Sequence, residues 1–204
     1  MKTPLLIFPY SGTAIEALDC LGDQYECVGF VSDDQEQIGK ESLGIKIYSR
    51  DIFDIDKESK ILLVHGSPTS FLKRPQIIHS IELDSLRYAK VIHPSAQISN
   101  YAKIGYNCLI MANVVVSANA EIGNHICILA NSSIHHDSKI GDYSLIAGSV
   151  LVAGNVEIGE NCYIGGAASI KNGIKIGEKV LVGMASNVVN NIESNNVIKG
   201  NPAK

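Results

Sequence analysis

The stretch AEIGNHICILANSSIHHDSKIGDYSLIAG, residues 120–148, carries an isoleucine at every sixth position. The same beat continues in both directions, and Ile or Val occupies sixteen consecutive hexads between residues 98 and 188. The residue two places before each of these positions is small or apolar, as expected where strand alternation points both side chains inward. Each hexad is therefore predicted to be a short strand followed by a corner.

A second period, of 18 residues, groups the hexads in threes and is marked by Gly105, Gly123, Gly141, Gly159 and Gly177. Because a six-residue unit cannot bury its own apolar side, three-sided coils must stack into a solenoid with a continuous Ile and Val core. Tight corners also predict left-handed backbone dihedrals three residues after an inward aliphatic. The asparagines at such positions are Asn107, Asn113, Asn119, Asn131, Asn155, Asn161 and Asn191.

The sequence changes character near residue 92. Before it, the apolar runs LLIF (5–8), VGFVS (28–32) and ILLVHG (61–66) alternate with stretches of helical spacing. This alternation is typical of βαβ units. We therefore expect a Rossmann-like α/β domain over residues 1–92 and a parallel β-helix over residues 93–204.

Charge and composition exclude several functional classes. The net charge is -4, and Lys and Arg are scattered, which argues against nucleic acid and anionic membrane surfaces as partners. No uninterrupted apolar segment approaches the roughly 20 residues that span a bilayer. The start MKTPLLIFPYSG lacks a signal-peptide cleavage pattern, so a cytoplasmic protein is expected.

The cysteines are five in number and irregularly spaced, without a CxxC pair. Such a pattern favours small apolar filler residues over zinc or redox sites. Cys108 and Cys162 both point inward but lie three coils apart, roughly 14 Å, which is too far for a disulfide.

The chain resembles the hexapeptide-repeat acyltransferases. The features that carry the resemblance are the hexads, the preceding βαβ domain, the terminal VIKGNPAK and the stretch SIHHDSKIGDYSLIAGSVLVAGNVEIGENCYIGGAASI (133–170). The chain is most similar to bacterial sugar O- and N-acyltransferases, which include sialic acid O-acetyltransferases and N-acetyltransferases of UDP-linked 4-amino sugars. The resemblance implies a left-handed coil, although general crossover rules favour right-handed connections. It also implies acetyl-CoA as co-substrate, no metal, and a homotrimer with the CoA cleft between protomers.

Acetyl transfer from a thioester needs a base, a group that orients the base, and a donor for the oxyanion. Histidine suits the base near neutral pH, but spacing alone leaves His135 and His136 open. The resemblance assigns the base to His136 and its partner to Asp137, with His135 beside the substrate groove. It assigns the oxyanion donor to the amide of Gly154, which the 18-residue period independently stacks on the same corner. The alternatives without a catalytic role are that His136 is a solvated surface histidine, that Asp137 is only a turn residue, and that Gly154 only suits a corner.

Gly148, Gly166 and Met184 form another column with the 18-residue spacing. By resemblance, the pantetheine arm of acetyl-CoA lies against Gly166 and near Met184. Leu145 stands where the family often carries a second histidine that contacts the acyl donor, and Leu129 replaces an expected asparagine. These departures leave the donor contacts and the identity of the acyl group open.

The first domain is expected to hold the acceptor. In the loop FPYSGTA (8–14), Ser11 and Gly12 are candidates for lining a nucleotide pocket at a helix N-terminus. Asp33 and Asp34 follow the second strand at the family's position for acceptor contacts, and Arg74 is a candidate partner for a phosphate. The alternatives are a polar loop for the two aspartates and a solvated arginine.

The predicted function is an acetyl-CoA-dependent acetyltransferase acting on an amine or hydroxyl of a sugar in bacterial surface-glycan biosynthesis, with a nucleotide-linked sugar expected. A non-catalytic scaffold is the alternative, because Pro9 and Tyr10 stand where the resembled family has small residues in the nucleotide loop, and Leu145 removes a donor contact. A zinc hydrolyase on the same fold would need three converging histidines. The spacing of His125, His135 and His136 does not stack all three.

Overall fold

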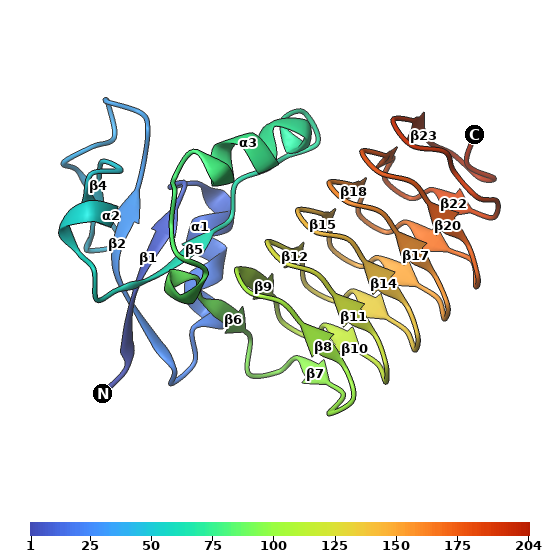
Figure 1. Cartoon of the computed structure of the whole chain (residues 1–204), viewed down its shortest axis with the longest axis horizontal. Coiled ribbons are helices and arrows are strands. Elements are labelled where there is room, and N and C mark those ends of the chain that lie inside the picture. Colours follow the sequence, from blue (N-terminus) through green and yellow to red (C-terminus); the bar gives the residue numbers. More distant parts are fainter.

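The computed structural model describes residues 1–204, and its two parts lie side by side (Figure 1). The N-terminal part contains a five-stranded sheet in the order β3-β4-β2-β1-β5, parallel except for β3. The strands are β1 (Thr3–Phe8), β2 (Tyr25–Val31), β3 (Glu41–Ser42), β4 (Ile45–Tyr48) and β5 (Lys60–Leu63).

Helical segments connect β1 to β2 and β4 to β5, whereas β2, β3 and β4 follow one another without a helix. Leu5 and Ile7 on one face of β1 pack with α1 and η1, whereas Leu6 and Phe8 on the other face pack with α2 and α3. Successive strand side chains point to opposite faces, so the run LLIF is buried on both. The segments are α1 (Gly12–Glu16), η1 (Ala17–Cys20), α2 (Ile52–Ile55), η2 (Phe71–Lys73), α3 (Arg74–His79) and η3 (Ser85–Arg87).

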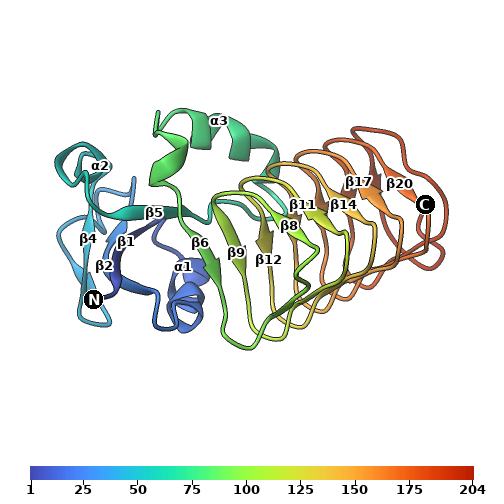
Figure 2. The ribbon, with the colours of Figure 1, turned by 60° about the horizontal axis from the view of Figure 1, so that its bottom comes forward.

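The C-terminal part is a three-sided parallel β-helix, and this part of the fold prediction is confirmed. The coils stack away from the N-terminal part, while α3 lies along the first of them (Figure 2). Paired residues are 18 apart, as in Val115 with Ser133. The β-helix begins at β6 (Lys90–Ile92), slightly before the expected residue 93.

Each side of the β-helix is one sheet. The docking face contains β6, β9 (Cys108–Ile110), β12 (Cys127–Ile128), β15 (Leu145–Ile146), β18 (Tyr163–Ile164), β21 (Leu181–Val182) and β23 (Val197–Ile198). The charged face contains β8 (Lys103–Ile104), β11 (Glu121–Ile122), β14 (Lys139–Ile140), β17 (Glu157–Ile158) and β20 (Lys175–Ile176). The third face contains β7 (Gln97–Ile98), β10 (Val115–Val116), β13 (Ser133–Ile134), β16 (Leu151–Val152), β19 (Ser169–Ile170) and β22 (Asn187–Val188).

The predicted inward residues form one continuous core along the β-helix. Its first members, Ile98 and Ile104, are only partly buried because no coil covers them from below. Of the corner asparagines, all except Asn191 adopt positive φ. The last coil is two residues short, since Ile176 pairs with Ile192 and Val182 with Ile198, so position 191 is no longer the equivalent corner.

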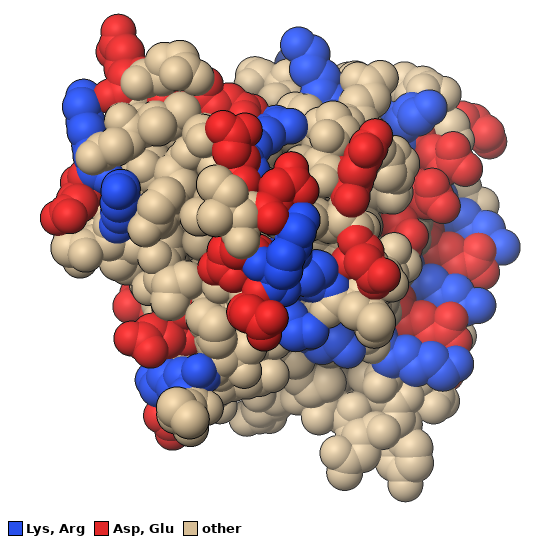
Figure 3. All heavy atoms as spheres, turned by 60° about the vertical axis from the view of Figure 1, so that its left-hand side comes forward, with Lys and Arg blue, Asp and Glu red and all other residues tan.

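The outward side chains differ between the faces. On the docking face Leu109, Cys127 and Leu145 are buried against the N-terminal part. The charged face instead alternates Lys and Glu and is exposed to solvent, with Lys103 and Glu121 paired at 3.3 Å. Lys and Arg are interspersed with Asp and Glu over the side seen in Figure 3, in agreement with the scattered charges of the sequence. No helix is both long and apolar enough to cross a membrane.

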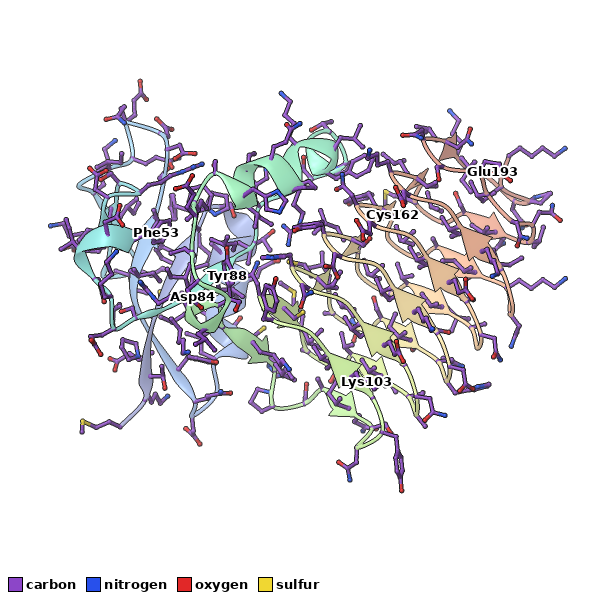
Figure 4. The ribbon with its side chains drawn as sticks, in the orientation of Figure 1. Phe53, Asp84, Tyr88, Lys103, Cys162 and Glu193 are labelled. Carbon is purple, nitrogen blue, oxygen red and sulfur yellow. The ribbon has the colours of Figure 1, made fainter.

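Asn107 and His125 join the two parts at the docking face, close to Tyr88 (Figure 4). The Asn107 Oδ1 accepts from the Leu63 N–H at 2.7 Å, and its Nδ2 donates to the Leu63 carbonyl and to His125 Nδ1. His125 Nδ1 must therefore accept, which places the ring proton on Nε2. Burial, followed by the Arg74 charge, lowers the pKa of His125 to about 4, so the imidazole is neutral.

Candidate active site

His136 and Asp137 form a hydrogen-bonded pair at the corner between the third face and the charged face. The two atoms His136 Nδ1 and Asp137 Oδ2 are 2.7 Å apart. Asp137 adopts a φ of 60°, which turns its carboxylate back toward the imidazole. Asn119, one coil earlier, donates from Nδ2 to Asp137 Oδ1 at 3.0 Å. Asp137 is thus both the turn residue of this corner and the hydrogen-bond partner of His136.

The hydrogen bonds set the protonation of this pair. Those from His136 and Asn119 lower the pKa of the Asp137 carboxyl, which keeps it ionised. An ionised carboxylate can only accept, so Nδ1 is the donor, and in the neutral imidazole Nε2 presents its lone pair. The His136 side chain is 56% exposed, which leaves Nε2 accessible to a reactant.

Gly154 stacks directly on this corner in the next coil, where Asn155 N–H donates to the His136 carbonyl at 3.0 Å. A Cβ at position 154 would lie 2.7 Å from both Cε1 and Nε2 of His136. The Gly154 N–H donates to no group in the chain. The side of Gly154 that lacks a side chain therefore lies against the His136 ring, close to Nε2.

The second histidine stands apart from this pair. The side chain of His135 is exposed and makes no hydrogen bond. It follows Ile134, whose side chain is buried, and so points outward beside the third face as strand alternation predicts. Its contribution to a substrate groove stays a prediction.

The predicted donor column lies at the corner between the docking face and the third face. Gly148 and Gly166 stack through the bond from Ala167 N–H to the Gly148 carbonyl, and Ala185 N–H continues the column by donating to Gly166. Met184 is 79% exposed at the top of this column. The backbone carbonyls and open surface suit an extended, uncharged chain.

Leu145 is placed differently from the rest of the predicted donor site. It lies on the docking face, three residues before Gly148, and is buried against Gly66 of the N-terminal part. It borders a cavity of about 220 Å³ whose other lining residues include Thr13, Ser67 and Tyr163. A leucine here extends the apolar contact between the two parts, where a histidine would introduce a polar ring.

The candidate acceptor residues lie at the carboxyl ends of β1 and β2, the edge where open parallel sheets bind ligands. Ser11 caps the short helix α1 by accepting from Ala14 N–H, and Gly12 is exposed. Asp34 accepts from Glu36 N–H at 2.9 Å and so shapes its own loop. Asp33 engages Arg50 with both carboxylate oxygens, each 2.6 Å from a guanidinium nitrogen.

Arg74 is neither a phosphate-binding residue at the sheet edge nor a solvated arginine, contrary to both expectations from the sequence. Its side chain is fully buried at the start of α3. The guanidinium donates from Nη2 to the His125 carbonyl at 2.7 Å and from Nη1 to the His65 carbonyl. Two converging backbone carbonyls hold the charge inside the junction of the two parts, so Arg74 cannot reach a ligand at the sheet edge.

Arg50 and His65 are two further polar residues at this sheet edge, and no sequence motif indicates them. Arg50 lies over the Phe8 ring at 4.7 Å, and the buried Nε2 of His65 has no partner. Burial, followed by the Arg74 charge, lowers the pKa of His65. Their positions just after strands β4 and β5 are the signal that would have found them, because ligands gather at carboxyl ends of parallel strands.

The three-sided cross-section separates the two halves of the candidate site. The corner that carries His136 lies between the charged and third faces, opposite the docking face. The N-terminal part, with Ser11 and Asp33, packs on the docking face. His125 lies at yet another corner, with Nδ1 bonded to Asn107, so it does not converge with His135 and His136 on a metal.

Comparison with known families and structures places the chain among related proteins. Residues 89–190, half of the chain, match the model of the family described as GMPPB C-terminal domain. The chain belongs to this family. A search of curated proteins found no match.

Solved structures share the fold of this GMPPB C-terminal domain family member over its whole length. The acetyltransferase domain of PglB from Neisseria gonorrhoeae is 21% identical, with a TM-score of 0.84 over 100% of this chain and 99% of that one. PerB from Caulobacter crescentus, solved with CoA and GDP-perosamine, is 23% identical, with a TM-score of 0.82 over 100% and 97%. WeeI from Acinetobacter baumannii is 21% identical, with a TM-score of 0.82 over 100% and 99%.

Proposed function

We propose that this protein transfers an acetyl group from acetyl-CoA to an amine or hydroxyl of a sugar, with a nucleotide-linked sugar as the expected acceptor. The observation that carries the proposal is the His136–Asp137 pair, whose Nε2 lies against Gly154, a residue with an unpaired backbone N–H. The similar structures support it, since a PglB acetyltransferase domain was solved with acetyl coenzyme A and PerB with CoA and GDP-perosamine.

The reaction follows from this geometry as a direct transfer. The acceptor amine or hydroxyl attacks the thioester carbonyl while His136 Nε2 takes its proton. The Gly154 N–H donates to the developing oxyanion, and ionised Asp137 stabilises the imidazolium. Cleavage of the C–S bond then releases the thiolate, which recovers the proton from His136. The products are the acetylated sugar and free CoA thiol.

We place the donor along Gly148, Gly166 and Met184, and the acceptor at the sheet edge near Ser11, Gly12, Asp33 and Asp34. Arg50 replaces Arg74 as the acceptor-side cation, and it also fixes the carboxylate of Asp33. His135 borders the groove beside the base. The reaction belongs to surface-glycan biosynthesis by the resemblance described above.

We further propose a homotrimer of left-handed β-helices, as the resemblance implies. The separation of His136 from the N-terminal part of its own protomer supports an acceptor supplied by a neighbouring subunit. Apolar side chains exposed on and beside the third face support a contact there. They are Val115 (36% exposed), Leu151 (40%), Met184 (79%) and Val189 (37%).

The test is an acetyl-CoA turnover assay against a panel of nucleotide-linked amino sugars and free sialic acids, with thiol release as the signal. The wild type should turn over at least one acceptor, and His136→Ala should lower kcat by roughly 10²- to 10⁴-fold. Full activity in His136→Ala would remove this base from the mechanism. Absence of both turnover and thermal stabilisation by acetyl-CoA would favour a scaffold instead.

A further inference from the structure

Three buried serines in the coil that carries His136 bond to the next coil in the same way. Ser132, Ser138 and Ser144 occupy its three corners, point inward and are fully buried. Each hydroxyl donates to a carbonyl 15 residues later and accepts from an N–H 18 residues later. The donor bonds reach Ala147 O at 2.8 Å, Ala153 O at 2.8 Å and Gly159 O at 3.0 Å, and the accepted bonds come from Val150, Val156 and Cys162.

Only Ser138 connects the base to the oxyanion donor. It directly follows His136 and Asp137 in the chain, at the corner where the base stands. Its two partners, the Ala153 carbonyl and the Val156 N–H at 3.1 Å, lie on either side of Gly154. One hydroxyl thus joins the corner that holds Nε2 to the corner that presents the Gly154 amide.

The β-helix itself does not require serine at this position. The same inward position is occupied by Ala120 one coil earlier and by Val156 one coil later, and both are buried. Cys108 and Cys162 occupy inward positions elsewhere and donate weakly from Sγ to carbonyls 15 residues on, at 3.3 and 3.1 Å. Apolar side chains therefore suffice to build a coil, and the hydroxyl at 138 adds a fixed link between two coils.

We propose that Ser138 is a positioning residue that sets the distance between His136 Nε2 and the Gly154 N–H, an inference that rests on the proposed acetyl transfer. Backbone bonds already hold the coils in register, but none of them involves the Ala153 carbonyl or the Gly154 N–H, the two polar groups of the peptide between these residues. Ser138 is the group that bonds to this peptide, through the Ala153 carbonyl. A hydroxyl that both donates and accepts in a dry core restricts the tilt of this peptide, because breaking either bond strands a buried polar group. Misplacing a catalytic group by about 1 Å can cost roughly 100-fold in rate.

Ser144 supplies the matched control. It is equally buried and makes the same pair of bonds, but its corner faces Gly159 and Cys162, where no proposed site residue lies. Ser138→Ala and Ser144→Ala should shift the urea unfolding midpoint by similar amounts. Only Ser138→Ala should lower kcat, by roughly 10-fold with both KM values unchanged. Ser138→Cys, which keeps a weak donor, should recover part of that loss.

A second measurement follows the Gly154 amide by ¹H–¹⁵N NMR. Ser138→Ala should move the Gly154 amide resonance and the ring resonances of His136, whereas Ser144→Ala should leave both in place. Equal kcat losses in the two alanine variants, or an unmoved Gly154 resonance in Ser138→Ala, would overturn the proposal. If the wild type acetylates no acceptor, the proposed function fails, while the NMR comparison still decides whether Ser138 positions Gly154.

Discussion

Gly154 has no side chain, and the His136 imidazole occupies the space where a side chain at position 154 would lie. A Cβ at position 154 would approach Cε1 and Nε2 of His136 to 2.7 Å. The backbone does not demand glycine here, because φ at 154 is not positive and the equivalent corner position one coil before His136 is Ala118. The absence of a side chain at 154 is therefore explained by the histidine it faces.

Gly154→Ala should consequently impair catalysis without unfolding the protein. The added methyl group must displace the His136 imidazole, which moves Nε2 and distorts the hydrogen bond between His136 and Asp137. We expect kcat to fall by roughly 100-fold and the free energy of unfolding to change by less than about 1 kcal/mol. Steady-state kinetics and urea unfolding measure the two quantities. Asn172→Ala, at the same corner one coil later, is the control, and equal kinetics in both variants would contradict the contact.

Asp137→Asn should trap His136 in the wrong tautomer. An asparagine Nδ2 facing the imidazole donates to Nδ1, so the proton moves to Nε2 and the base is lost. Asparagine also tolerates the positive φ of this corner, which preserves the fold. The expected decrease in kcat is roughly 10²- to 10⁴-fold, with an unchanged melting temperature. Asp142→Asn, at another corner of the same coil, should keep its activity; undiminished kcat in Asp137→Asn would limit Asp137 to a turn role.

Arg74→Met should destabilise the junction between the two parts. The substitution keeps much of the side-chain volume but removes charge-assisted bonds to the buried carbonyls of His125 and His65. Losses of this kind cost about 2–4 kcal/mol of unfolding free energy. The exposed neighbour Lys73→Met should cost less than about 0.5 kcal/mol. A stable Arg74→Met variant with a raised acceptor KM would instead restore the phosphate-binding hypothesis.

Acid should lower the free energy of unfolding because of the low pKa of His125 in the folded chain. Its pKa is about 4 in the folded chain against 6.5 for the ordinary group, so between these values the unfolded state binds the extra proton. The free energy of unfolding should therefore be highest above pH 6.5, fall as the pH drops toward 4 and level off below it, with a total loss on the order of 3 kcal/mol.

Urea unfolding at intervals from pH 7.5 to 3.5 measures this loss. His125→Phe retains a ring against Tyr143 but cannot titrate, so its stability should vary less over the same interval. His135→Phe, which replaces an exposed histidine of the β-helix, should keep the wild-type slope. An identical slope in the wild type and His125→Phe would assign the acid sensitivity to another group.

The sequence by itself determined the β-helix, its register and the stacking of its corners. Ile134, Ile140 and Ile146 are interpretable alone because the same burial recurs in every hexad, so weak local preferences add up to one unambiguous pattern. The same arithmetic stacks Gly154 on His136. It failed at Asn191, where the coil shortens by two residues and the repeat no longer holds.

Only the tertiary structure decided how the two parts meet. Arg74 reads as a surface residue until α3 is laid against the β-helix, where the carbonyls of His125 and His65 enclose it. Arg50, not Arg74, reaches the sheet edge and grips Asp33, a pairing of residues 17 apart that no local pattern encodes. In a repeat, the contacts between coils recur at a fixed spacing that is visible in the sequence. A junction between unlike parts instead forms from single residues that are distant in the chain and occur once, so no spacing indicates it.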